Sequence, residues 1–155
     1  KVRGIEARRR DTPPWITQVQ LQLLEILAQA PSAGDLPAYL PAARRRLEAA
    51  LQDLRRGRVP LPDLLVAQKL SREVEAYKTP SPAARAAAQL QACGKTIRPG
   101  QRVRFLFTLG KPGVYAWDLP APPDPRTVDV PRYAGLLQRA ADTILAPLAA
   151  AKGTG

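Results

Sequence analysis

Apolar side chains recur at helical spacing in three long stretches of the chain, at residues 13–29, 36–56 and 131–150. In each stretch they return every three or four residues, which places them on one side of an α-helix and predicts a buried stripe. The predicted core positions are Ile16, Val19, Leu23, Ile26 and Leu27 in the first stretch, Tyr39, Leu40, Ala43, Leu47, Ala50, Leu51 and Leu54 in the second, and Tyr133, Leu137, Ala140, Ile144 and Leu148 in the third. The opposite faces, rich in glutamine in the first helix and in charged residues in the second, are expected to be polar. On the second helix, Glu48 is expected to pair with Arg44 one turn away.

A fourth helix is predicted at residues 82–93 by the signals at its two ends. Pro82 suits the first helical position, because the N–H group that proline lacks would have no helical partner there. Thr79 or Ser81 can cap the helix at its start, and Gly94 can end it.

The start of this fourth helix also has features of a phosphate site. Free N–H groups at a helix N-terminus attract anions, and Arg72, Lys78 and Arg85 lie close by in the sequence. An ordinary capped helix with solvated basic residues would give the same pattern, so both interpretations remain open at this point.

Two β-rich runs, at residues 103–109 and 114–117, are separated by a turn of glycine, lysine and proline. This pattern predicts a β-hairpin. Alternation places Val103, Phe105 and Phe107 on one face, which we expect to be core. The other face is expected to carry Arg102, Arg104, Leu106 and Thr108. Its arginines are either solvated or meet phosphates.

The remaining segments are short. Residues 64–67 fit a short strand or an extended link, residues 1–10 fit a strand without a nearby partner, and the proline-rich residues 119–126 fit an extended surface connection. At 155 residues the chain is long enough for one domain with a modest core. We therefore predict a mainly α fold of the α+β class.

Charge narrows the class of partner. The formal net charge is +11, and arginine supplies most of the cations. Guanidinium groups bind phosphate through two parallel hydrogen bonds, which favours nucleic acid. A membrane partner is disfavoured, since no helix sets a lysine face against an aromatic one. No apolar run is long enough to cross a bilayer and no signal-peptide core is present, so we expect a soluble, intracellular protein.

Catalytic chemistry is not expected from this chain alone. It has no histidine, its carboxylates are scattered, and it lacks a phosphate-binding glycine loop. The single cysteine, Cys93, lies among apolar helical residues, which favours a buried and inert thiol. Methionine is absent, so we expect a processed chain or a piece of a longer one. We predict no catalytic residue, no metal ligand and no cofactor.

Two runs of the sequence, taken in order, resemble the C-terminal end of family B DNA polymerases of archaeal and bacterial type. The first is KVRGIEARRRD at residues 1–11. In the family, a strand ending in Gly-hydrophobic-Glu and a basic-Asp pair leads there from the palm into the thumb. The second contains Tyr77 and Lys78, the proline-started alanine-rich helix, and the turn IRPG at residues 97–100 before a hydrophobic strand. The resemblance spans almost the whole chain and accounts for the strand without a partner.

The resemblance implies that residues 1–10 end the palm, residues 11–150 form the thumb, and residues 151–155 form a disordered tail. The implied fold is a helical thumb with a small β-hairpin and an N-terminal strand left over from the palm. The parent would be a DNA-directed DNA polymerase whose palm holds Mg²⁺. This chain would grip primer-template duplex DNA during replication or repair synthesis. Its partners would be that duplex and the palm and other polymerase domains, in the cytoplasm at the nucleoid.

Eight residues are the expected duplex contacts: Arg8, Arg9, Arg10, Arg72, Tyr77, Lys78, Lys95 and Arg98. A grip without sequence preference relies on the phosphate backbone, so the cations should face phosphates. Arg10 has the alternative of pairing with Asp11 or a helix carbonyl, and Tyr77 that of packing against the phenylalanine face. Two other functions remain open: a thumb-like DNA-binding module of an inactivated polymerase relative, and a helical adaptor for an acidic protein partner.

Overall fold

The computed structural model of the chain describes residues 12–70 and 81–154, and these residues fold into two compact units. The helical unit contains Pro14–Val59 and the chain from Val130 onward, and the sheet unit contains Pro60–Asp129. The predicted mainly α, α+β fold is confirmed. Whereas the chain length suggested one core, each unit has buried apolar side chains of its own. The strand predicted at residues 1–10 lies outside the described residues.

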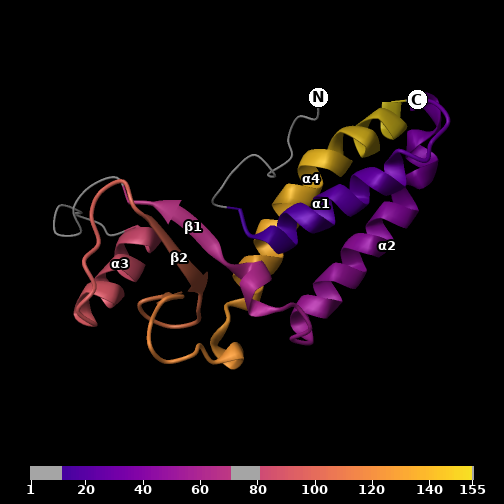
Figure 1. Cartoon of the computed structure of the whole chain (residues 1–155). Coiled ribbons are helices and arrows are strands. Elements are labelled where there is room, and N and C mark those ends of the chain that lie inside the picture. The colour runs from indigo at the N-terminus through magenta and orange to yellow at the C-terminus, as the bar shows by residue number, and fades with distance from the viewer. Residues whose placement is uncertain (1–11, 71–80, 155) are drawn as a thin grey trace. The chain divides into compact units, whose positions relative to one another are not determined.

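Three helices form the helical unit: α1 (Pro14–Leu27), α2 (Leu36–Arg55) and α4 (Val130–Thr154). A short 3-10 helix, η2 (Ala33–Asp35), links the first two. Figure 1 shows the three long helices side by side, with α2 running opposite to α1 and α4. The helix α4 continues past residue 150, where we expected it to end.

The core of the helical unit largely follows the predicted stripes, but Ile26, Tyr39 and Leu148, which were predicted as core, are only half-buried. Leu145 is buried in α4 and Ile144 is only half-buried, which rotates the buried stripe by one residue. Gln20 was expected on a polar face but is fully buried in α1, where its Nε2 donates to the carbonyl of Ala140 in α4 at 3.0 Å. A buried amide is tolerated because it is hydrogen-bonded.

The sheet unit contains the strands β1 (Val66–Lys69), β2 (Arg102–Phe107) and β3 (Val114–Ala116) in the order β1-β2-β3, all antiparallel. The predicted hairpin is therefore confirmed as β2 and β3. The run at residues 64–67 is shifted in the structure: η3 (Leu61–Leu64) precedes β1, which adds a third strand to the hairpin.

The helix α3 (Pro82–Ala92) covers one face of this sheet. Its inward positions are small, at Ala83, Ala84, Ala86 and Ala87, so the helix backbone can lie close to the strands. Val103, Phe105 and Phe107 are buried on that face as predicted, with the two phenylalanine rings edge to face at 5.5 Å. The face packs in the T-shaped geometry that aromatic pairs favour.

The opposite face of the sheet is divided between polar and buried positions. Arg102 and Arg104 are exposed, but Leu106 and Thr108, predicted to lie beside them, are buried. A β-bridge joins Thr108 to Val128, so the loop after β3 returns to the end of β2. The loop lies at the end of the face that carries Leu106 and Thr108, while Arg102 and Arg104 at the other end are exposed.

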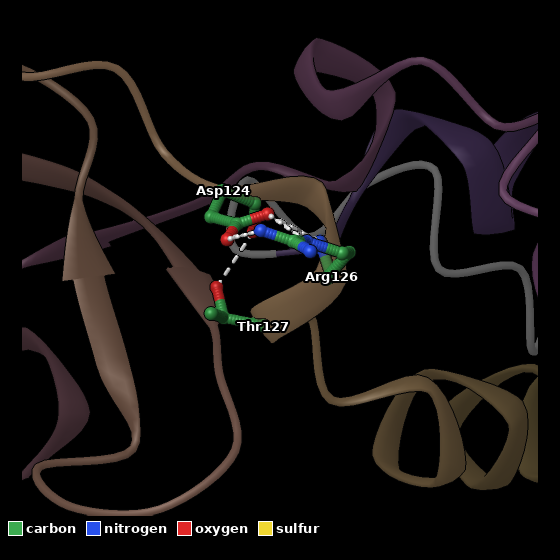
Figure 2. Close-up of polar contacts among 3 residues, drawn as sticks. All are labelled: Asp124, Arg126 and Thr127. Atoms are coloured by element: carbon green, nitrogen blue, oxygen red, sulfur yellow. Dashed lines mark hydrogen bonds and ion pairs between the residues drawn. The ribbon is translucent and has the colours of Figure 1, made fainter.

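The loop at residues 119–129 is anchored by a short 3-10 helix, η5 (Pro125–Thr127). Figure 2 shows the hydrogen bonds that join Asp124 to Arg126 and Thr127. Its carboxylate accepts hydrogen bonds from the backbone N–H of Arg126 at 2.9 Å and from the Arg126 guanidinium, and its carbonyl accepts one from Thr127 Oγ1 at 2.7 Å. Leu109 in turn donates its N–H to the carbonyl of Thr127 at 2.8 Å. The segment is a surface connection, as predicted, but one with fixed internal structure.

Candidate nucleic-acid interface

The predicted contact residues fall into two groups. Lys95 and Arg98 lie in the sheet unit and are both exposed. Six predicted contact residues lie outside the described part of the chain: Arg8, Arg9, Arg10, Arg72, Tyr77 and Lys78. The structure therefore places only the pair that follows α3, and the other six remain predictions.

The start of α3 is capped by its own sequence. Ser81, not Thr79, is the capping residue, and its Oγ accepts a hydrogen bond from the N–H of Ala84 at 3.1 Å. Arg85, the one described cation of the proposed phosphate site, donates from Nη1 to the carbonyl of Pro112 at 3.3 Å. The N–H of Ala84 at the helix start is thus bonded to Ser81, and the side chain of Arg85 is directed to the hairpin turn. These contacts favour the ordinary capped helix over a phosphate site.

The end of α3 fixes the position of Lys95. Gly94 has a φ of +88°, its N–H donates to the carbonyl of Gln91 at 2.9 Å, and the N–H of Lys95 donates to that of Leu90 at 3.1 Å. These two bonds form a Schellman motif, which needs a left-handed residue and so favours glycine. Lys95 therefore projects from a hydrogen-bonded helix end.

A second fixed turn carries Arg98. The N–H of Gln101 donates to the carbonyl of Arg98 at 3.1 Å, and the Gln101 side chain accepts a bond from the N–H of Arg98. Pro99 and Gly100, the latter at a φ of +92°, occupy the middle of the turn, as a type II turn requires. The N–H of Gly100 also donates to the carbonyl of Leu70 at 2.7 Å, which ties the turn to the end of β1.

Most cations among the described residues of the sheet unit have no carboxylate partner. Within residues 60–70 and 81–129, ion pairs join Arg104 to Asp118 at 2.8 Å and Arg126 to Asp124 at 3.2 Å. The exposed cations of these residues that make no ion pair are Lys69, Arg85, Lys95, Arg98, Arg102 and Lys111. This part of the molecule therefore presents an excess of uncompensated positive charge.

Lys69 was not identified from the sequence. It ends β1 and lies directly opposite Arg102 in the register of the sheet. Arg102 was predicted on the polar face of the hairpin, where its side chain was expected either to be solvated or to meet phosphates. The signal for Lys69 is a pairing between strands more than thirty residues apart in the sequence, which local patterns do not contain.

The outer face of α2 is less suited to a polyanion. Arg46 donates to the side chain of Gln22 at 2.7 Å, and Glu48 lies 3.9 Å from Arg55, not from Arg44 as predicted. A shallow groove between α2 and α4 is lined by residues of both signs, among them Arg44, Glu48 and Asp142. Opposite charges interspersed in this way reduce the attraction for phosphate.

Two further expectations can be compared with the described residues. Cys93 is exposed, which corrects the buried thiol we predicted: it follows the last turn of α3, where the helix has already left the sheet. Among residues 12–70 and 81–154, none of the helices combines the length and apolar content needed to cross a bilayer.

The fold of this chain is found within a DNA polymerase. It is similar to part of the family B DNA polymerase from the hyperthermophilic archaeon Pyrobaculum calidifontis, with a TM-score of 0.71 and 22% identity over 86% of this chain and 18% of that chain. DNA polymerase 1 of Sulfolobus acidocaldarius is 26% identical over 94% of this chain, and the DNA polymerase of Desulfurococcus sp. (strain Tok) is 29% identical over 70% of it.

Residues 1–143 match the family model of DNA polymerase family B, and the chain belongs to that family. The family resemblance seen in the sequence is thus confirmed. The chain spans 16% of the length of the Sulfolobus polymerase and 13% of that of the Desulfurococcus polymerase.

Proposed function

We propose that this chain is the thumb of a family B DNA polymerase and grips the primer-template duplex through its backbone phosphates. The observation that carries the proposal is the presentation of Lys95 and Arg98 on two anchored turns, exposed and without ion pairs, in a chain of this family. Duplex DNA would be the partner, together with the palm and other domains of the parent polymerase, in the cytoplasm at the nucleoid.

Anchored turns suit this role for an energetic reason. Binding orders flexible side chains and loops at a cost of about 0.5–1.5 kcal/mol for each rotamer-rich side chain, and a preorganised backbone avoids part of the loop term. At Lys95 and Arg98 the backbone is already held by hydrogen bonds to Leu90, Gln101 and Leu70. The two side chains can therefore meet phosphates without first ordering the main chain.

The proposed division of labour places the chemistry elsewhere in the parent. Polymerisation through two metal ions needs closely paired carboxylates, and the described part of this chain offers no group of three or more potential metal ligands. Mg²⁺ would then be held in the palm of the parent polymerase. The role left to this chain is to hold the product duplex, which depends on charge and position and not on base identity.

The salt dependence of duplex affinity tests this proposal. The affinity of the 155-residue chain for a primer-template duplex is measured over a range of salt concentrations, and then for a variant with Lys95→Ala and Arg98→Ala. Each lost phosphate contact should reduce the logarithmic slope by about 0.9, so the double variant should lose about two units. The matched control carries Arg104→Ala and Arg126→Ala. These arginines already have carboxylate partners, and their replacement removes the same amount of positive charge.

Two outcomes would contradict the proposal. One is an unchanged slope in the Lys95 and Arg98 variant, or an equal change in the control. The other is tight binding of an acidic protein that excess duplex does not displace, which an adaptor would show and a thumb would not.

A further inference from the structure

Two cations face each other across neighbouring strands, on the face of the sheet that carries Arg104. Lys69 in β1 and Arg102 in β2 are direct partners in the antiparallel register, and both are exposed. Side chains at directly opposed positions have Cβ atoms about 4.5–5.5 Å apart, and like charges placed there destabilise a sheet. The sheet therefore carries an unfavourable pair of like charges where β1 ends and β2 begins.

No carboxylate of the described residues offsets this pair. The ion pairs of this unit are Arg104 with Asp118, whose Oδ1 accepts from Arg104 at 2.8 Å, and Arg126 with Asp124, so neither Lys69 nor Arg102 has a described carboxylate partner. Arg102 makes one long contact, from Nη1 to the carbonyl of Ala67 at 3.5 Å. A guanidinium has five N–H donors, so most of those of Arg102 remain available.

The pair lies next to the turn that presents Arg98. Leu70, which follows Lys69, donates its N–H to the carbonyl of Gln101 at 2.8 Å and accepts from Gly100 at 2.7 Å. Gln101 precedes Arg102, so these two bonds join the chain segments that carry all three cations. Three positive side chains thus extend from one hydrogen-bonded end of the sheet.

We propose that Lys69 and Arg102 form a phosphate clamp that binds the DNA backbone between them. The inference rests on the proposed duplex grip and adds two contacts to it. A phosphate placed between two cations replaces their repulsion with two attractions, and the guanidinium fork can bind two phosphate oxygens at once. Positions that break a local rule of stability are where binding function is expected, and among the described residues no ion pair compensates this one.

The clamp predicts opposite effects of one substitution on stability and on binding. Lys69→Glu places a carboxylate opposite Arg102, so the thermal midpoint of the free chain should rise by up to about 4 °C. The same change should weaken duplex binding and reduce the logarithmic salt slope by at least about one unit.

A second variant, with Lys69→Gln and Arg102→Gln, should reduce the slope by about two units. Arg126→Gln, which removes one paired cation of the same unit, is the control and should leave the slope unchanged.

The outcomes separate this inference from the proposed function. If the unmodified chain binds the duplex and loses slope on Lys95→Ala and Arg98→Ala, but the Lys69 and Arg102 variants keep the full slope, the clamp is overturned and the proposed function stands. If the unmodified chain does not bind the duplex, both are overturned. Weaker binding together with a raised midpoint in Lys69→Glu supports the clamp, whereas a lowered midpoint with unchanged binding overturns it.

Discussion

Asp124 shows how much local order a single exposed carboxylate can impose. It caps η5 through the N–H of Arg126 and also bonds the guanidinium of the same residue (Figure 2). The side-chain hydrogen bond from Arg126, followed by the backbone bond and the attraction of the positive charge, lowers the pKa of Asp124 below its ordinary value of 3.8. Hydrogen bonds to a carboxylate favour its charged form.

The pKa of Asp124 gives a prediction at this scale. Because the folded pKa is lowered, the stabilisation by this carboxylate should be complete above its ordinary pKa of 3.8 and should disappear as the pH falls through the lower folded value. Carbon NMR of the carboxyl group during an acid titration measures the pKa directly. We expect Arg126→Gln to raise the pKa of Asp124 toward its ordinary value, since the main cause of the shift is removed.

The control for this titration is Arg104→Gln, which removes a cation paired with a different carboxylate, Asp118. It should leave the titration of Asp124 unchanged. An unmoved Asp124 titration in Arg126→Gln would show that the contacts in Figure 2 do not set the pKa.

At the scale of elements, α3 is tied to the edge of the sheet by one side chain. Gln89 donates from Nε2 to the carbonyl of Val114 at 2.9 Å, and its Oε1 accepts from the N–H of Ala116 at 2.7 Å. Both partners lie in β3, which ends the three-strand order. The amide thus makes the two bonds that a further strand would make, and it fixes the helix against the sheet that carries the proposed contacts.

Removing this amide tests its structural role. Gln89→Ala leaves a part-buried N–H and C=O without their partner, which should cost about 1–3 kcal/mol of unfolding free energy. Hydrogen exchange at the N–H of Ala116 should accelerate more than at the paired strands β1 and β2. Gln91→Ala, on the same helix, should change stability by less than about 0.5 kcal/mol. Equal losses in the two variants would show that the amide bonds of Gln89 are not responsible, because alanine is the better helix former and propensity alone would not lower stability in either variant.

The sequence predicted the elements better than their pairings. All four long helices were found because apolar spacing and the proline and glycine signals act within a few residues, as at Pro82 and Gly94. The pairing of β1 with β2 depends on contacts between residues 66–69 and 102–105, far apart in the chain. The candidate site shared this limit: Lys95 and Arg98 were named from the family resemblance, in a segment with local glycine and proline turn signals, whereas the opposition of Lys69 to Arg102 follows only from the register.

At the scale of the whole molecule, the cations of α2 and those of the sheet unit differ in how far neighbouring groups balance their charge. The outer face of α2 mixes its arginines with Glu48 and a bond to Gln22. The sheet unit leaves six exposed cations without ion pairs among its described residues. Local concentration of one sign, and not the net charge of +11 alone, makes the sheet unit the better candidate for phosphate binding.

Processivity of the parent polymerase provides the last prediction. If this chain grips the duplex while the chemistry takes place elsewhere, Lys95→Ala with Arg98→Ala in the full polymerase should act on dissociation. Loss of one charge-assisted contact of about 1.5 kcal/mol raises the dissociation rate about tenfold, so the number of nucleotides added per binding event should fall by about that factor or more. Single-nucleotide incorporation on saturating duplex should change little, because the transition state of bond formation loses no contact.

The paired-cation variant with Arg104→Ala and Arg126→Ala provides the comparison in the same assays. It removes equal charge, so a general electrostatic effect would lower processivity in both variants alike. A loss confined to the Lys95 and Arg98 variant would locate the grip at the two turns. An incorporation rate that falls in step with processivity would instead mean that these turns act on the geometry of the reacting primer end, since dissociation alone leaves the chemical step of a saturated enzyme unchanged.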